Sequence, residues 1–372
     1  MSTKKSTSNT NSKPSKGVAV AFSALGSYIE SRIVDATETK NYRNEFIEWG
    51  KGNAFPQYLL SLYRDVASLR SVINGSTDYV VGNAIISSVP LLMGEINDEG
   101  QTITDLVECI AKDYYLYGGY AIEVGRNKVG DVASLRPLDF SKLRTDKHNK
   151  VIYYSDSWGN SRARATMYQH FNPEHRGIRT SVLYVKNTHY RTYPEPLYIA
   201  SLKACEVERA IDEYHLNAIN NNFSASYIVN FNNGVPEDKQ KTEIVKMFTE
   251  KFTGQQNAGR IAFSWNNSSE NATTLQKLDT DDFGERYTAL AKHSRQQIYT
   301  AFRANPNLFG IPTDNLGFSS EEYAEAFKLY NRTQIRPVQA KIVDSLDKIF
   351  GVKGSIVIEP FSIEEDNEKA VE

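Results

Sequence analysis

The fold of this chain is constrained most by a long helix that the sequence predicts to begin after Pro194 and to end at Asn220. Apolar residues recur there in alternating steps of three and four, a 3.5-residue repeat typical of a helix with one narrow apolar face. About 25 residues at 1.5 Å each give a rod of roughly 38 Å. Because the narrow face covers one side only, the flanks of this rod must contact something else. The repeat consists of Leu197, Ala200, Ala204, Val207, Ile211, Tyr214 and Ala218.

A second long helix is predicted over residues 280–303. Three aspartates between residues 279 and 282 suit its first turn, where the helix dipole favours negative charge. Lys292 and Arg295 lie off the apolar stripe of this helix, so they face its polar side. The stripe consists of Phe283, Tyr287, Leu290, Ala291, Ile298, Ala301 and Phe302.

The segment between the two rods, residues 226–278, has the pattern of a small α/β insert. Strand formers occupy residues 227–231 and 260–265, and Pro236 marks the start of a helix between them.

A loop and a third helix follow the second rod. Residues 305–317 are rich in Asn, Pro and Gly, which predicts an irregular loop. A capping box at residues 319–322 predicts the start of a helix that stops at Gly351. Pro337 lies inside this helix and is expected to kink it just upstream, because proline removes a backbone donor and clashes with the preceding turn.

The first half of the chain favours an α+β arrangement. Helical spacing over residues 56–85 and 103–116 precedes segments rich in strand formers, with Gly, Asn and Asp at the breaks. The predicted strands lie at residues 120–124, 129–135, 151–154 and 181–186.

Charge and composition exclude several classes of protein. The chain has 43 Lys and Arg against 45 Asp and Glu, so its net charge of −2 argues against a protein that coats DNA through excess positive charge. Lysines gather in residues 1–18, predicted as a disordered basic arm, and acidic residues gather after residue 359. No apolar run approaches the ~18 residues of a membrane span, and no secretory signal is visible. The two cysteines, Cys109 and Cys205, fit folding in a reducing intracellular compartment, and both are interpreted as core residues.

No catalytic constellation, metal site or cofactor motif is evident. The six histidines form no HExxH motif and no Cys/His pair at zinc-like spacing, and the chain has neither a P-loop nor a GxSxG elbow. His170, Glu174 and His175 share a polar stretch that is interpreted as a turn with exposed histidines. We therefore predict no catalytic residue, no metal and no cofactor. The competing hypothesis is a metal-dependent hydrolase or nuclease that uses the Asp and His residues of 146–189.

The order of these elements suggests an assembly. A single copy with two long rods around a small insert leaves the sides of the rods poorly covered. A ring of copies placed side by side would cover them, with the 305–317 loop directed towards the axis.

Three stretches of the sequence resemble the portal proteins of tailed bacteriophages, specifically the type found in phages with HK97-like heads. The first stretch covers residues 114–124 and 130–138, with its Gly-Gly-Tyr step and its Leu-Arg-Pro-Leu ending. The second runs from Tyr214 into the strand at residue 227. The third runs from residue 297 through Asn-Pro-Asn-Leu-Phe-Gly to Pro337. Their order and spacing carry the resemblance across most of residues 60–350.

The resemblance implies a portal-type α+β fold with named parts. Residues 40–196 would form an α/β wing, followed by two stem helices that flank a small α/β clip. A tunnel loop and a kinked helix leading towards a reduced crown would follow. The implied segments are 197–225 and 279–303 for the stem helices, 226–278 for the clip, 304–319 for the tunnel loop, 320–350 for the kinked helix and 351–372 for the C-terminal tail.

The resemblance also implies partners and a location. Similar proteins form a ring, most often of twelve copies, at one capsid vertex of the virion after assembly in the host cytoplasm. Double-stranded DNA passes through the ring. The terminase large subunit, head–tail adaptor proteins and the major capsid or scaffold protein contact it, and no membrane is involved. The alternative within the same assembly is a head–tail adaptor, a class of shorter proteins.

The resemblance also implies roles for particular residues, and some of these residues have an alternative interpretation. Lys292, Arg295 and Arg303 either line the DNA channel or pair with acidic residues of a neighbouring copy. In the tunnel loop, polar side chains either contact DNA or serve turn chemistry; these are Asn305, Asn307, Asp314 and Asn315. The stem packing and subunit interface are assigned to Val207, Ile211, Tyr214, Tyr287 and Leu290. The Tyr-rich stretch at 114–120 is expected in the wing core and interface, because a duplex offers no unstacked bases.

Overall fold

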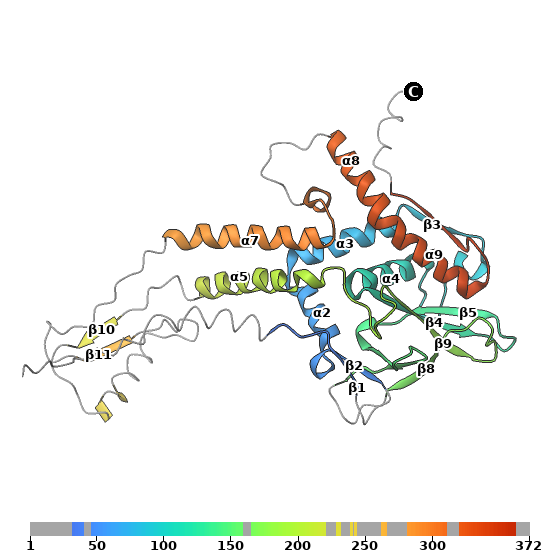
Figure 1. Ribbon diagram of the computed structural model, residues 1–372, viewed down its shortest axis with the longest axis horizontal. Coiled ribbons are helices and arrows are strands. Elements are labelled where there is room, and N and C mark those ends of the chain that lie inside the picture. Colours follow the sequence, from blue (N-terminus) through green and yellow to red (C-terminus); the bar gives the residue numbers. More distant parts are fainter. Residues whose placement is uncertain are drawn as a thin grey trace, which may run out of the picture.

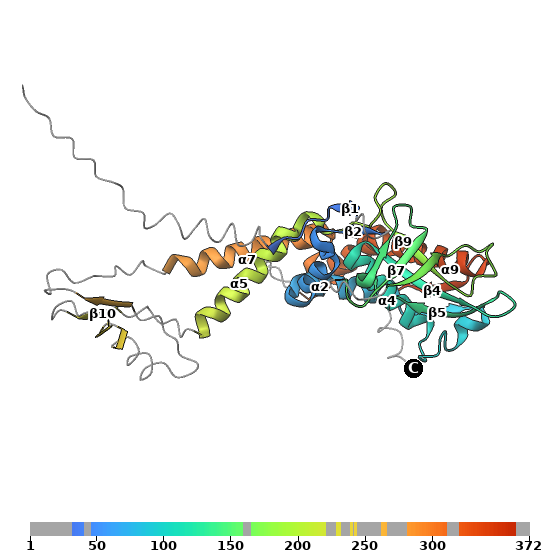
Figure 2. The same cartoon turned by 90° about the horizontal axis from the view of Figure 1, so that it is seen from below.

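The computed structural model describes residues 32–40, 46–158, 165–220, 228–231, 239–240, 242–243, 262–265, 281–310 and 320–361. A mixed α/β body carries two long helices, α5 (Leu202–Asn220) and α7 (Asp281–Ala301), that project from it side by side (Figures 1 and 2). The short strands β10 (Ile228–Phe231) and β11 (Ala262–Trp265) pair in parallel and lie beyond the far ends of these helices. This arrangement agrees with the predicted insert between two rods.

An eight-stranded sheet forms the centre of the body. Its order is β1-β2-β6-β7-β8-β9-β4-β5, and every neighbouring pair is antiparallel except β8 and β9. The bounds are β1 (Glu38–Lys40), β2 (Ile47–Trp49), β4 (Gly119–Arg126), β5 (Val132–Pro137), β6 (Leu143–Thr145), β7 (Val151–Tyr154), β8 (Thr166–His170) and β9 (Thr180–Lys186).

Helices cover this sheet and connect it to the projecting pair. The predicted helix at 56–85 is in fact two helices, because Val66 has extended backbone angles between them. The bounds are α2 (Phe55–Asp65), α3 (Ala67–Val81), α4 (Ile103–Tyr117), α8 (Ser320–Tyr330) and α9 (Arg336–Phe350), with short 3-10 turns at Lys51–Asn53, Pro90–Met93, Phe140–Lys142, Ile199–Ser201 and Pro306–Phe309. Within the described ranges, no helix has the length and apolar character that crossing a bilayer requires.

Helix α4 shows how the local sequence sets an element. Thr102 and Asp105 form a capping box, in which the Thr102 backbone N–H donates to the Asp105 carboxylate at 2.7 Å. Leu106, Val107 and Ile110 are fully buried on the inner face of the helix. Cys109 lies on its other face and is exposed, so its interpretation as a core residue was wrong.

The Tyr-rich stretch packs into the body, as predicted. Tyr115, Tyr117 and Tyr120 are buried, and the Tyr120 hydroxyl lies 2.7 Å from Ser345 Oγ on α9. This contact fixes α9 against β4 of the sheet, so the C-terminal helix becomes part of the body.

The irregularity expected upstream of Pro337 is present. Residues Asn331–Ile335 form one π-helical segment between α8 and α9. Within the segment expected as a C-terminal tail at 351–372, Ile356–Glu359 forms strand β12, which pairs antiparallel with β3 (Ala84–Ser87). Four residues of alternating burial are too short a pattern to identify a strand without its distant partner.

Gly118 makes the turn from α4 into β4 and gives a test of the fold. Its φ is +84°, and a Cβ added there would lie 2.2 Å from the carbonyl oxygen of Glu195. Gly118→Ala should lower the free energy of unfolding by roughly 1–3 kcal/mol from backbone strain alone, with the clash adding to it. Urea denaturation measures the loss.

Gly177→Ala is the matched control, because an added Cβ at Gly177 meets nothing within 4 Å. Its urea midpoint should stay at the parent value. Equal midpoints for the two variants would contradict the strained turn at Gly118.

Candidate functional site

The helix pair α5–α7 is antiparallel along its length. Ser201 Oγ, just before α5, donates to the Gln297 carbonyl at 2.9 Å. Further along, the rings of Tyr214 and Tyr287 stack with centroids 4.9 Å apart. As the residue number rises on α5 it falls on α7, so the chain leaves the body on one helix and returns on the other (Figure 2).

The predicted packing residues divide between the inside and the outside of the pair. Ile211 is buried at 7% exposure, and Val207 and Tyr287 are half-buried. Tyr214 and Leu290 are 49% and 43% exposed, in spite of their apolar surface. Leu216, which the repeat did not include, is 59% exposed on the same helix pair. The narrow apolar face of α5 therefore covers α7 in part and leaves large side chains exposed.

The base of α5 is held by ionic contacts. Glu206 is fully buried and accepts three hydrogen bonds from Arg209, at 2.6 and 2.8 Å from Nη2 and at 3.2 Å from Nε. Arg209 also reaches Asp65 on α2 at 3.2 Å, and Arg32 lies 3.6 Å from Glu206. The carboxylate is thus matched by guanidinium groups, as a buried charge requires.

Glu208 continues these contacts towards α3 and α7. Its carboxylate accepts a hydrogen bond from Ser68 Oγ at 2.5 Å, and Arg295 of α7 lies 3.6 Å away. Burial, followed by the charges of Glu208 and Glu206, raises the pKa of the Cys205 thiol. Cys205 therefore stays a neutral packed side chain, as predicted.

This cluster of charges was not predicted from the sequence. Glu206 and Arg209 stand three residues apart, the spacing at which helical side chains meet, and this was the available signal. Their burial depends on α2 and α3, which lie far away in the sequence, so the residues near Glu206 and Arg209 do not indicate it.

The segment after α7 is ordered at its start. Arg303 is exposed and has a left-handed backbone with φ +52°. Asn305 Oδ1 accepts the backbone N–H of Asn307 at 3.1 Å and so caps the turn Pro306–Phe309. Leu308 and Phe309 are buried, and their carbonyls accept hydrogen bonds from Tyr79 and Ser71 of α3, respectively.

The other predicted site residues are placed as follows. Lys292 is exposed on α7, and Arg295 pairs with an acidic residue of its own chain. Asp314 and Asn315 lie outside the described residues. In the described part of the chain, no group of three His, Cys, Asp or Glu side chains is arranged to hold a metal ion. His170 Nδ1 lies 2.9 Å from the Phe171 carbonyl oxygen.

Comparisons with known proteins support one family. The family model described as phage portal protein matches residues 64–363, which is more than half of the chain. Among curated proteins, none matches the sequence significantly.

Solved structures have the same fold at low sequence identity. A chain in the neck of the native GTA particle computed with C12 symmetry matches at a TM-score of 0.53 and 20% identity, over 84% of this chain and 86% of that chain. A chain in the virion of the native gene transfer agent particle matches at 0.53 and 19%, over 81% and 83%. An HK97 family phage portal protein from Corynebacterium diphtheriae matches at 0.49 and 11%, over 78% and 88%. The first two show that the α+β fold predicted from the sequence is correct.

The buried ion pair at the base of α5 gives a test of this arrangement. Arg209→Met leaves the carboxylate of Glu206 buried with Arg32 as its remaining cation, so the free energy of unfolding should fall by about 3–5 kcal/mol. Urea denaturation of the purified chain measures this loss.

Lys112→Met serves as the control, because Lys112 and Glu108 form an exposed pair on α4 at 3.3 Å. Its cost should stay below about 1 kcal/mol. A loss at Arg209 no larger than that at Lys112 would show that the base of α5 does not depend on the buried charges.

Proposed function

Because this chain belongs to the phage portal protein family, we propose that its copies form a ring at one vertex of a capsid, through which double-stranded DNA is packaged and ejected. The observation that carries the proposal is the helix pair α5–α7, which projects from the body (Figure 1). Large apolar side chains on this pair are exposed. A neighbouring copy placed side by side would cover them. A similar solved structure is a neck computed with C12 symmetry, and we propose a ring of twelve for this chain.

The described elements suggest a role for each part. We propose the body from residue 40 to 196 as the wing and the helices α5 and α7 as the stem. The parallel pair β10–β11 would belong to the clip at residues 226–278, which meets the terminase large subunit during filling and adaptor proteins afterwards. Helices α8 and α9 would form the kinked segment that leads towards a reduced crown.

The charge of the chain suits a channel. A polyanion slides more easily when few phosphates are neutralised, since each neutralised phosphate adds affinity and friction. We propose Lys292 and Arg303, both exposed, as rings of positive charge in the channel. Arg295 pairs with Glu208 of the same chain at 3.6 Å, so its contribution to the channel would be smaller.

We propose that the tunnel loop begins later than residue 304, the start predicted from the sequence. Residues up to Phe309 are anchored on α3, so we propose residues 311–317 as the part that contacts DNA. Asn305 then serves as a cap for the anchored turn.

The remaining assignments follow from the family. We propose a structural, non-enzymatic role, with the ring in the virion after assembly in the host cytoplasm. The major capsid or scaffold protein would surround the wing.

The stem interface is tested by placing charge on its exposed apolar surface. Leu216→Glu together with Leu290→Glu should leave the melting temperature of the monomer near the parent value, because both side chains are exposed. The double variant should lose rings, since burying an unpaired carboxylate opposes association. Mass photometry measures the fraction of chains in rings.

Met167→Glu is the control, because Met167 is 67% exposed on β8, far from the helix pair. It should form rings like the parent chain. Rings formed as well by the Leu216/Leu290 variant as by this control would remove the stem interface from the proposal.

The tunnel loop is tested by a deletion within residues 311–317, which spares the anchored turn. Rings should form in normal yield, whereas the amount of DNA protected from nuclease in a packaging assay should fall at least tenfold. Parent-level DNA protection by these rings would contradict the proposed contact with DNA.

A further inference from the structure

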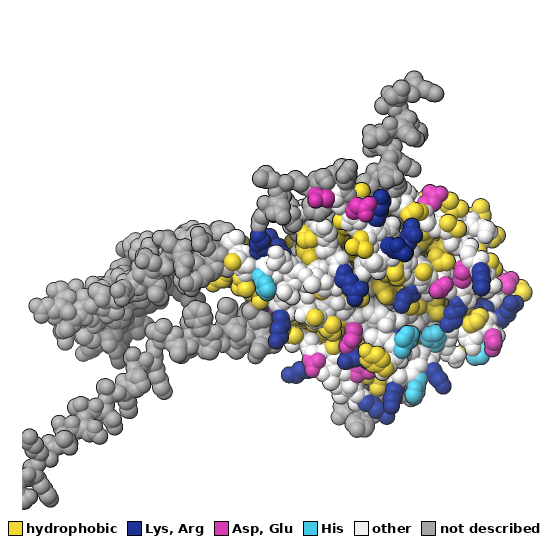
Figure 3. All heavy atoms as spheres, turned by 45° about the horizontal axis from the view of Figure 1, so that its top comes forward, with side chains coloured by type: hydrophobic (Ala, Val, Ile, Leu, Met, Phe, Trp, Pro, Cys, Tyr) yellow, Lys and Arg dark blue, Asp and Glu magenta, His cyan; other side chains and the backbone are white. Residues whose placement is uncertain are grey.

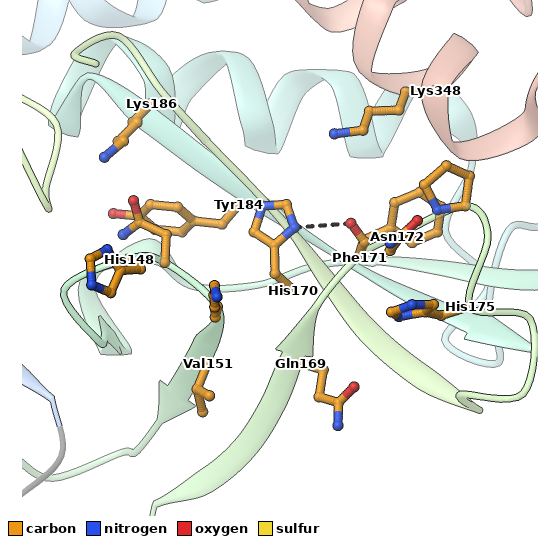
Figure 4. A pocket seen from close by; sticks show the side chains of 13 residues that line it. His148, Val151, Gln169, His170, Phe171, Asn172, His175, Tyr184, Lys186 and Lys348 are labelled. Carbon is orange, nitrogen blue, oxygen red and sulfur yellow. Dashed lines mark hydrogen bonds between the residues drawn. The ribbon is translucent and has the colours of Figure 1, made fainter. Parts of the chain in front are cut away.

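The large sheet has a gap beside helix α9, away from the helix pair. Strand β8 ends at His170, whereas its neighbour β9 continues to Lys186. The two strands pair only at Gln169 with Ser181 and at His170 with Val182, so β8 leaves the second half of β9 uncovered. A cavity of about 890 Å³ lies at this place, between the turn before β7, the end of β8 and helix α9 (Figure 4).

The uncovered part of β9 has backbone groups that face the gap. The Val182 carbonyl accepts the backbone N–H of Phe171 at 2.8 Å, so the backbone polar groups of Val182 point towards β8. Backbone groups of successive strand residues point to opposite edges, so those of Tyr184 and Lys186 point the same way as those of Val182. In the described part of the chain, no hydrogen bond reaches Tyr184 or Lys186 from this side. Both residues line the cavity and an adjoining one of about 370 Å³.

Four lysines from three places in the chain line the two cavities. Lys150 directly precedes β7, and Lys348 extends over the larger cavity from α9, across from Lys186 on β9 (Figure 4). Lys341 stands seven residues before Lys348, so the two lie on one face of the helix. Among the described residues, no ion pair involves Lys150, Lys341 or Lys348.

The charge around the gap is positive. Asp344 is the one acidic side chain among the described residues that line either cavity. Figure 3 shows lysine and histidine side chains gathered on one face of the body. A chain with a net charge of −2 thus has a cavity lined by four lysines and one carboxylate, which attracts an acidic ligand.

The strand edge and the lysines together select the class of ligand. An open edge presents both N–H donors and carbonyl acceptors, and a strand of another chain supplies the matching groups. The phosphates of a nucleic acid accept hydrogen bonds only, so they would leave the carbonyls of Tyr184 and Lys186 without a donor. An extended peptide with acidic side chains satisfies the edge and the lysines at once.

We propose that the gap binds an extended acidic segment of another protein. The segment adds to β9 as a strand along residues 183–186 and places its carboxylates beside Lys150, Lys341 and Lys348. Alternate side chains of a strand share a face, so acidic residues at every second position all face the same side of the sheet. This inference goes beyond the proposed ring and does not depend on it.

Fluorescence anisotropy with the purified full-length chain tests the binding. The probe is a fluorescein-labelled ten-residue peptide with Glu at every second position and Thr or Val between, and its control has Gln in place of Glu. The Glu peptide should bind saturably, and the Gln peptide should bind at least tenfold more weakly. Equal affinities, or no saturable binding of the Glu peptide, would overturn the proposal.

Paired substitutions locate the binding. Lys150→Gln with Lys348→Gln should weaken binding of the Glu peptide at least tenfold, and both side chains are exposed, so the fold should not change. Lys128→Gln with Lys328→Gln removes the same charge from exposed positions elsewhere on the body and should change the affinity less than twofold. Equal effects of the two pairs would contradict binding in the gap.

Two N-methylated forms of the Glu peptide test the strand pairing. One form carries N-methyl groups at its Glu residues, and the other carries them at the residues between. Neighbouring residues of a strand point their N–H groups to opposite edges, so only one form loses the donors that face β9. That form should bind at least tenfold more weakly than the other. Equal affinities of the two forms would show a purely electrostatic contact and would contradict strand addition.

A DNA duplex separates the remaining alternative. An unlabelled twelve-base-pair duplex should not displace the bound Glu peptide at physiological salt. If the duplex displaces the peptide, and if Lys150→Gln with Lys348→Gln weakens duplex binding as much as peptide binding, the gap binds nucleic acid and the proposal is wrong.

Discussion

The helix pair depends on the buried contact between Glu206 and Arg209 at the base of α5. A rod that projects from a body needs a rigid attachment, and an apolar face as narrow as that of α5 supplies only part of one. The carboxylates of Glu206 and Glu208 reach Arg209 on the same helix, and they also reach Arg32, Ser68 and Arg295, which come from three other parts of the chain. Any arrangement that separates these partners leaves an unpaired buried charge, which is strongly unfavourable. The attachment therefore has one favourable geometry.

That attachment determines what the rest of the molecule can do. It directs α5 and α7 away from the sheet, so Tyr214, Leu216 and Leu290 cannot turn inward to the core of the body. Exposed apolar surface on two paired rods is typical of a subunit that completes its packing in an assembly. The family match and the fold agree with this, and the proposed ring joins the two observations.

Much of the fold could be predicted from local patterns. The rods follow from apolar spacing, and the capped helix α4 agrees with the helical run at 103–116. A kink upstream of Pro337 was predicted, and the structure has a π-helical segment at that place. Features that depend on distant partners could not be predicted. Strand β12 forms only by pairing with β3, and the turn at Pro306–Phe309 is held by hydrogen bonds from Ser71 and Tyr79. The exposure of Cys109 depends on which face of α4 is covered by the rest of the body. Which apolar residues of α5 and α7 are exposed became clear only from the structure. The apolar repeat does not distinguish residues buried within the chain from residues that stay exposed.

End-on electron-microscope images of the purified full-length chain test the central claim most directly. The account predicts ring-shaped particles with a central hole and twelve repeated subunits, with the paired helices beside the hole. Particles of a single 42.0 kDa chain, with no hole at any protein concentration examined, would contradict it.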